Sequence, residues 1–305
     1  MGRTRLKPGV VTWLLLAPCL IVLCSLFLGG LLFGLAQSLG LWSVVDVGGP
    51  TLAFYGALLG NADITQSLGL TLYVAAVSTL LASVASLALA LLLRQTFRGT
   101  RALRLLVQLP LPVPHLVAAI GIALLLTQSG VLARLFHAAG LIAAPEQFPT
   151  LIYDRAAVGI ILTYVWKELP FMTLVTLAAL RASGEEAERI ARNLGARPSQ
   201  VLWHITLPLI APALLGAATI VFAFTFGAFE VPLLLGQSYP RLLAVEAYAR
   251  YQDTDLAVRP AALALNTLIA LCTALAVPPY IWLLRRSGWM AQDPTTETRP
   301  LPSAG

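Results

Sequence analysis

The amino-acid sequence predicts an all-α integral membrane protein. Of its 305 residues, 58% are hydrophobic and only 11% are charged, whereas soluble domains carry roughly 25% charged residues. No run alternates polar with apolar residues as the strands of a membrane barrel do, so the chain is expected to cross the bilayer as helices. Five runs lack Asp, Glu, Lys and Arg, and each exceeds the ~20 residues that a spanning helix needs. These runs are residues 8–45, 64–93, 105–133, 198–229 and 260–284.

Six spanning helices are expected, because a further apolar run is interrupted only by Lys167 and Glu168. The first run follows the basic stretch "GRTRLK" and contains "GLAQS", a pattern also found in secretory signals. Its apolar core is longer than the ~7–15 residues of such a signal, so it is predicted to remain as a helix. The predicted helices lie near residues 11–35, 67–93, 104–127, 157–181, 209–235 and 260–284.

The distribution of Lys and Arg predicts which ends of the helices face the cytoplasm. The termini and the second and fourth connections hold fourteen of the twenty basic residues, the other connections hold five, and Lys167 lies within a span. Basic residues favour the cytoplasmic side, which places both termini inside and residues 36–66, 128–156 and 237–259 outside. The same bias accounts for the net charge of +6, so no nucleic-acid partner is expected.

The two ends of the chain are predicted to lie outside the membrane domain. Residues 1–10 form a cytoplasmic N-terminal segment, residues 11–285 form the six-helix domain, and residues 286–305 form a cytoplasmic tail. From Asp293 onward the tail is polar and rich in proline, a composition typical of disorder.

The connection at residues 182–207 is predicted to begin with a short amphipathic helix. Seven charged residues lie between Arg181 and Arg197, in a chain that has only thirty-four Lys, Arg, Asp and Glu. Ser183 and Glu186 fit a capping box, which satisfies the first free amides of a helix. An apolar stripe follows at the spacing of one helical face, formed by Ala187, Ile190, Ala191 and Leu194.

A second short helix is predicted after Gly195, which supplies a left-handed stop. Pro198 suits the first turn of this helix, and Pro208 is expected to open the fifth span. The result is a helical hairpin with an apolar stripe and a charged rim. Two interpretations remain open: the hairpin folds against its own bundle, or it is a docking surface for a cytoplasmic partner.

This connection resembles the signature loop of permease subunits of binding-protein-dependent ABC importers. The shared pattern is Gly195, nine residues, Ile205, one residue and then Leu207–Pro208, placed before the penultimate span. In that family the loop docks into a groove on the ATPase subunit. The family begins the motif with Glu-Ala-Ala six residues before the glycine, where this chain has Arg189. The departure puts one expected contact in doubt and leaves the docking role in place.

The resemblance extends from about residue 67 to 285 and implies a six-helix type I ABC importer transmembrane domain with a cytoplasmic coupling helix. It implies multi-pass insertion in the bacterial inner membrane and three protein partners: ABC ATPase subunits, a second permease subunit (homologous or identical) and an extracytoplasmic substrate-binding protein. The residues expected to contact or position the ATPase are Glu186, Ala187, Glu188, Ala191, Leu194, Gly195, Ala196, Arg197, Ile205, Leu207 and Pro208.

The chain itself is not expected to be an enzyme or to bind a cofactor. Its two lysines, Lys7 and Lys167, do not belong to a GxxxxGK[ST] loop, so ATP and Mg are expected on the partner ATPase. No Ser/His/Asp or Cys/His set has a usable spacing, and the three histidines fall on separate segments. Neither catalytic nor metal-binding residues are therefore expected.

Ionisable residues within the spans are candidates for the solute pathway, because such groups are costly in a membrane and suggest function. Lys167 and Glu168 lie near the middle of the fourth span, and His115 ends the proline-rich stretch "PLPVPH" of the third. Phe226 and Glu230 lie toward the outer end of the fifth and are candidates for a gate. The alternatives are a structural Lys167–Glu168 pair with a packing histidine, and an aromatic anchor at the membrane interface.

The cargo and the outer surface are less strongly specified. The stretches "FAFTFGAFEVPLLLG" and "NLGA" resemble the spermidine/putrescine group and its relatives for iron, thiamine, phosphonate or sulfate, which implies a polyamine or another small solute. The outer connection 237–259 is predicted to contain a short helix around Leu243–Tyr251, either a docking site for the binding protein or a solvated loop. A secondary transporter is the alternative function; it would show paired interrupted helices in two halves, and the proline-rich stretch alone does not.

Overall fold

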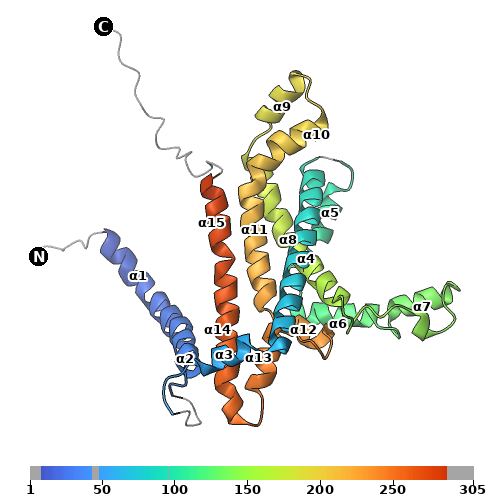
Figure 1. Cartoon of the computed structure of the whole chain (residues 1–305). Coiled ribbons are helices and arrows are strands. Elements are labelled where there is room, and N and C mark those ends of the chain that lie inside the picture. Colours follow the sequence, from blue (N-terminus) through green and yellow to red (C-terminus); the bar gives the residue numbers. More distant parts are fainter. Residues whose placement is uncertain (1–7, 43–47, 96, 287–305) are drawn as a thin grey trace, which may run out of the picture. The chain divides into compact units, whose positions relative to one another are not determined.

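The computed structural model describes residues 8–42, 48–95 and 97–286, and every regular element in this part of the chain is a helix (Figure 1). Six helical segments are long and apolar enough to cross a membrane, which confirms the six predicted spans. They are Val11–Ser38, Ala62–Arg94, His115–Ala138, Val158–Ala182, Pro198–Gly227 and Leu256–Trp282. The predicted disorder of the tail concerns residues outside the described ones.

The chain divides into two compact units, of which the first comprises residues 1–65 and 246–268. It contains α1 (Pro8–Leu23), a π-helical turn, α2 (Gly29–Ser38) and α3 (Ala53–Leu59). The most apolar window of the first span has no buried side chain, and a helix that is apolar on all sides suits a lipid or protein environment. α13 (Leu243–Tyr251) and α14 (Arg259–Leu275) cross the boundary between the units.

The second unit comprises residues 66–245 and 269–305 and holds the central spans. Its main helices are α4 (Ala62–Arg94), α5 (Thr100–Gln108), α6 (His115–Leu126), α7 (Val131–Ala138), α8 (Val158–Ala182), α9 (Glu186–Asn193), α10 (Pro198–Val201), α11 (Leu207–Gly227), α12 (Glu230–Leu235) and α15 (Val277–Arg286). Figure 1 shows α9 and α10 at one end of α8 and α11, and α12 at the opposite end.

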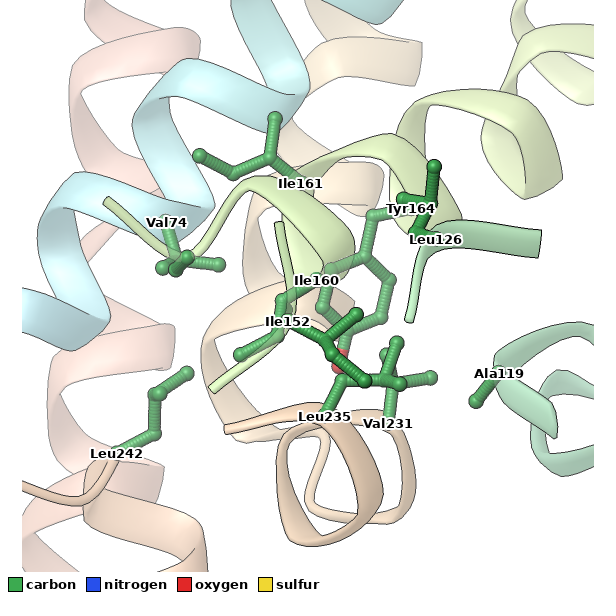
Figure 2. Close-up of a cluster of buried hydrophobic side chains, with 11 residues drawn as sticks. Val74, Ala119, Leu126, Ile152, Ile160, Ile161, Tyr164, Val231, Leu235 and Leu242 are labelled. Atoms are coloured by element: carbon green, nitrogen blue, oxygen red, sulfur yellow. The ribbon is translucent and has the colours of Figure 1, made fainter. Parts of the chain in front are cut away.

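Two apolar clusters stabilise opposite ends of this unit. The first surrounds Tyr164 of α8, whose ring is fully buried and lies among Ile152, Ile160 and Leu235 (Figure 2). The second joins the end of α4 to α5, α8 and α11 beneath the α9–α10 hairpin, and consists of Ala90, Leu93, Val107, Leu177, Leu180 and Ile210. The hairpin therefore lies on a packed base of span ends.

The third predicted helix, 104–127, is not continuous. α5 ends at Gln108 and α6 begins at His115. Prolines at 110, 112 and 114 remove backbone donors and disfavour helical geometry in the residues before them. The prediction of a single helix through these prolines was therefore wrong.

The fifth predicted helix, 209–235, is wrong at both ends. The helix starts earlier than predicted: α10 begins at Pro198 and continues through a π-helical turn, Leu202–Thr206, directly into α11. The wider turn lies just before Pro208, which has no amide to donate. At the other end α11 stops at Gly227, Ala228 is extended with ψ of 139°, and α12 is a separate short helix.

Candidate functional site

Residues 182–207 form the predicted hairpin, and Gly195 turns the chain as expected. Its φ is +88°, in the left-handed region. The amide of Ala196 donates to the carbonyl of Ala191 and the amide of Gly195 to that of Arg192, both at 3.0 Å. This pair of bonds is a Schellman motif, which satisfies the free carbonyls at the end of α9. Pro198 then occupies the first turn of α10, as predicted.

The predicted capping box at the start of α9 is wrong. Ser183 is still helical and caps α8, and its hydroxyl donates to the carbonyl of Ala179 at 2.7 Å. Gly184 follows with φ of +70°, and α9 begins at Glu186 without a side-chain cap. A serine at the end of one helix therefore bonds backward, because the carbonyl one turn earlier lies within its reach.

The apolar stripe of α9 is largely exposed. Leu194 is 84% exposed and Ile190 53%, and Trp203 beside the hairpin turn is 65% exposed. A hairpin folded against its own bundle would bury this stripe. Next to it lies a hollow of about 480 Å³ that is lined by Leu194, Gly195, Ala196, Gln200, Val201, His204 and Ile205. Exposed apolar side chains beside a hollow indicate a surface that binds another protein.

The other expected coupling residues divide between surface and interior. Glu186, Ala187, Arg197 and Pro208 are exposed. Ala191, Ala196, Ile205 and Leu207 are half-buried. The first set is available for contact with a partner, whereas the second packs partly within the hairpin and the start of α11.

Glu188 does not face outward, although it was expected to take part in docking. Its side chain is only 5% exposed and accepts from Arg94 at the end of α4, Arg192 of α9 and Thr206 before α11. Arg94 also pairs with Glu185 at 3.5 Å. We call these five residues the Glu188 cluster. Arg94 and Thr206 were missed, because sequence spacing alone gives no signal for pairs that are 94 and 18 positions apart.

The cluster holds the carboxyl group of Glu188 in its charged form. The hydrogen bond from Arg94 is the largest cause, and together with Thr206 and Arg192 it lowers the pKa of Glu188 from 4.5 to about 2, against the opposing effect of burial. Charge-assisted bonds of this kind are stronger than bonds between neutral groups. Glu188 is therefore ionised throughout the neutral range.

Lys167 and Glu168 do not pair with each other but with different partners. The ammonium of Lys167 donates to the carbonyls of Pro110 and Val113, at 2.8 and 2.5 Å. Both carbonyls belong to the break between α5 and α6. The Lys167 side chain therefore stabilises the backbone of that break by hydrogen bonds, and its charge is buried among backbone acceptors.

Glu168 instead contacts His115 at the first position of α6, with 3.1 Å between Oε1 and Nε2. The imidazole also lies 4.9 Å from the ring of Phe224 on α11. The side chains of His115 and Glu168 are 26% and 13% exposed. Three spans thus meet at a polar point that solvent partly reaches.

Phe226 and Glu230 lie on either side of the break between α11 and α12. Phe226 is 1% exposed and stacks with Phe222 at 6.0 Å between ring centroids. Glu230 is exposed at the start of α12, where a negative charge is favoured by the helix dipole. Phe226 is therefore a core residue of this unit, and only Glu230 is accessible. The short helix predicted in the connection 237–259 forms at the expected residues, as α13 (Leu243–Tyr251).

Comparison with known proteins identifies the family to which this chain belongs. Residues 70–287 match the family described as "Binding-protein-dependent transport system inner membrane component". The molybdenum transport system permease protein ModB of Mycobacterium tuberculosis is 32% identical over 228 residues, which cover 73% of this chain and 81% of that protein. The putrescine transport system permease protein PotI of Escherichia coli strain K12 is 28% identical over 223 residues, 72% and 73% of the two chains.

The fold is shared with a solved structure as well. A chain of a bacterial ABC transporter involved in the import of the acidic polysaccharide alginate superposes with a TM-score of 0.74 at 22% identity, over 90% of this chain and 96% of that one. The family match covers more than two thirds of the sequence and includes the hairpin and five of the six spans. The chain therefore belongs to the inner-membrane components of binding-protein-dependent transport systems and is a permease subunit of an ABC importer.

Proposed function

We propose that the hairpin at 182–207 is the site where a separate ATPase subunit acts on this permease. The exposed stripe of Ile190 and Leu194 carries the proposal, because it lies at the tip of a hairpin that is continuous with the fifth span. Closure of the ATPases would displace the hairpin, and the helices joined to it would alternate the access of the pathway. Both termini would then lie in the cytoplasm.

The ATPase, with its ATP and Mg, would be another chain. Lys7 and Lys167 are the only lysines of the sequence, and Lys167 is occupied by two backbone carbonyls. A P-loop lysine must instead reach the phosphates of a nucleotide. The remaining partners would be a second permease subunit and an extracytoplasmic binding protein, which meets the outer connections.

The pathway would pass the contact between His115 and Glu168. This pair lies beside the break between α5 and α6 and remains partly exposed. Ionisable side chains in a span are expensive unless they face protein or a water-filled route. In this proposal Lys167 stabilises the break, and the solute meets Glu168, His115 and the outer Glu230. Phe226, being buried, would act only by supporting α11.

We propose two candidate solutes for this transporter, and the first is an oxyanion of molybdenum. The relative named for molybdenum transport is 32% identical to this chain, and the one named for putrescine is 28% identical over a similar length. The difference is small, so putrescine remains the second candidate. Uptake of radiolabelled molybdate and putrescine into cells that overproduce the complete transporter would decide between them.

ATP dependence is tested separately from cargo. The tagged permease is purified from mild detergent with its ATPase and binding protein, and the complex is placed in sealed vesicles. Uptake should require internal ATP and Mg and should survive collapse of the proton and sodium gradients by ionophores. Uptake that stops with the gradients and ignores ATP would contradict the proposed function.

A further inference from the structure

Every acceptor site of the Glu188 carboxylate is used. An ionised carboxylate offers about four lone-pair sites on its two oxygens. Oε1 accepts from Arg94 Nη1 at 2.8 Å and from Thr206 Oγ1 at 2.7 Å. Oε2 accepts from Arg94 Nη2 and from Arg192 Nη2, the latter at 3.0 Å. The group therefore has no acceptor capacity left for a partner protein.

The donors come from three separate elements. Arg94 is the last residue of α4, Arg192 lies one turn along α9, and Thr206 is the last residue of the π-helical turn before α11. Thr206 and Glu188 are both buried. A single carboxylate thus ties the first helix of the hairpin to the ends of two different spans.

Apolar packing contributes little to this attachment. Glu188 is the only buried residue of α9. Of the apolar stripe only Ala191 is half-buried, whereas Ala187, Ile190 and Leu194 are exposed. The chain connection on its N-terminal side passes through Gly184, which is left-handed and has open space around it. Without the Glu188 cluster, α9 would be free to pivot on the spans.

We propose that Glu188 is a positioning residue that makes α9 move as one body with the ends of α4 and α11. The proposal rests on the proposed function and deepens it, since it says how displacement of the hairpin by a docked ATPase reaches the spans. The exposed stripe binds the partner, and the buried carboxylate carries the displacement into the membrane domain. Docking and transmission are thus separate tasks of neighbouring residues.

The proposal predicts uncoupling in the variant Glu188→Gln. The introduced amide would keep one acceptor oxygen but point an NH₂ group at the guanidinium nitrogens of Arg94 or Arg192, so donors would face donors. The exposed stripe is untouched, and the variant should still bind its ATPase. The matched control is Arg189→Gln, which removes a charge from an exposed position of the same helix, outside both the Glu188 cluster and the expected coupling residues.

The test compares the two variants as complete transporters in sealed vesicles. Co-purified ATPase, the rate of ATP hydrolysis, and uptake of labelled molybdate or putrescine, whichever the wild type carries, are measured together. Glu188→Gln should retain the ATPase and hydrolyse ATP, while uptake per ATP falls about tenfold, within the 5–150-fold range of coupling effects. Arg189→Gln should keep the wild-type ratio.

A reversible crosslink separates positioning from a mere role in folding. Arg94→Cys and Glu188→Cys are combined in a chain whose three native cysteines are replaced by alanine. Joining the two thiols with a short reducible bis-methanethiosulfonate should raise uptake per ATP, and reductant should lower it again in the same sample. A folding defect would not respond to the reductant.

Three results would overturn the inference. They are a wild-type uptake ratio in Glu188→Gln, loss of the ATPase from that variant, which would make Glu188 a docking residue, and a crosslink that leaves the ratio unchanged. Failure of the proposed function would look different, because the wild-type vesicles themselves would then show no ATP-driven uptake.

Discussion

The ammonium of Lys167 in the fourth span donates to the carbonyl of Pro110, 2.8 Å away and 57 positions earlier in the chain. Both carbonyls of the contact lie in the break between α5 and α6: that of Pro110 also accepts from the amide of Val113 at 3.2 Å, and that of Val113 accepts from Lys167. In a membrane such carbonyls must find a donor within the protein. A lysine that sequence reasoning placed on the solute pathway thus stabilises the path of the backbone.

Lys167→Met should therefore destabilise the protein. The methionine fills a similar volume but removes the donor to the Val113 carbonyl and one of the two donors to the Pro110 carbonyl. One unsatisfied buried group costs about 1–3 kcal/mol. The measurement is the apparent melting temperature of the purified permease in detergent, with Lys7→Met as control. A melting temperature equal to that of the wild type would show that the break does not depend on Lys167.

Glu168→Gln should reduce transport without reducing expression. The change keeps the size of the side chain, removes the charge-assisted contact with His115, and alters the partly exposed point where three spans meet. Such a bond is worth about 1.5–3 kcal/mol, so uptake should fall by tenfold or more, since 1.4 kcal/mol corresponds to ~10-fold. Wild-type uptake with normal expression would show that the contact between Glu168 and His115 has only a structural role.

The Glu188 cluster should be insensitive to pH in the range where transport is measured. The pKa of Glu188 is lowered from 4.5 to about 2 in the folded protein. A lowered pKa stabilises the fold at pH values above the unfolded pKa, and that contribution is lost as pH falls toward the folded pKa. The contribution of Glu188 to stability should thus be constant above pH 5 and should decline from about pH 4.5 to 2.

Chemical unfolding of the wild type and of Glu188→Gln over this range would reveal the decline. The stability difference between the two proteins should stay level at high pH and shrink only below about pH 4.5, where the carboxylate of the unfolded chain becomes protonated. A difference that already shrinks at neutral pH would contradict the assignment.

Side-specific labelling tests the topology. Single cysteines at Ser199, in α10, and at Ser238, after α12, are both at exposed positions. The charge bias predicts that Ser199 lies inside and Ser238 outside. A membrane-impermeant maleimide should label them from opposite sides of sealed vesicles. Labelling of both from the same side would overturn the orientation.

Much of the fold follows from local signals in the sequence. Five uncharged runs and one apolar run interrupted only by Lys167 and Glu168 locate the six spans, because length and hydropathy are sufficient for a helix in lipid. Gly195 and Pro198 give the hairpin turn, since glycine tolerates the left-handed conformation and proline restricts its own φ. The helix breaks were harder to predict from the sequence. The end of α11 at Gly227 has no proline to signal it. The π-helical turn before Pro208 depends on how the hairpin packs on the spans.

The candidate site was predicted in position but not in detail. The exposed stripe of α9 could be read from its spacing, whereas the burial of Glu188 could not. Its partners Arg94 and Thr206 come together only when α4, α9 and α11 are packed, and neither has a spacing relation to Glu188. The same holds for Lys167, whose nearest charge in the sequence, Glu168, is not its partner.

Gly195→Asp tests the central claim that the hairpin transmits the action of a separate ATPase. Its left-handed φ of +88° means that a Cβ costs roughly 1–2 kcal/mol, and the new carboxylate would lie on the hollow beside Leu194. The control is Gly184→Asp, at a second left-handed glycine with equally open surroundings, at the other end of α9.

Both variants should express normally, because no span is altered. The measurement is the amount of ATPase that co-purifies with each variant, together with ATP-driven uptake. Gly195→Asp should lose the ATPase and all uptake, and Gly184→Asp should keep both. A Gly195→Asp complex that retains its ATPase and transports as well as Gly184→Asp would contradict the account.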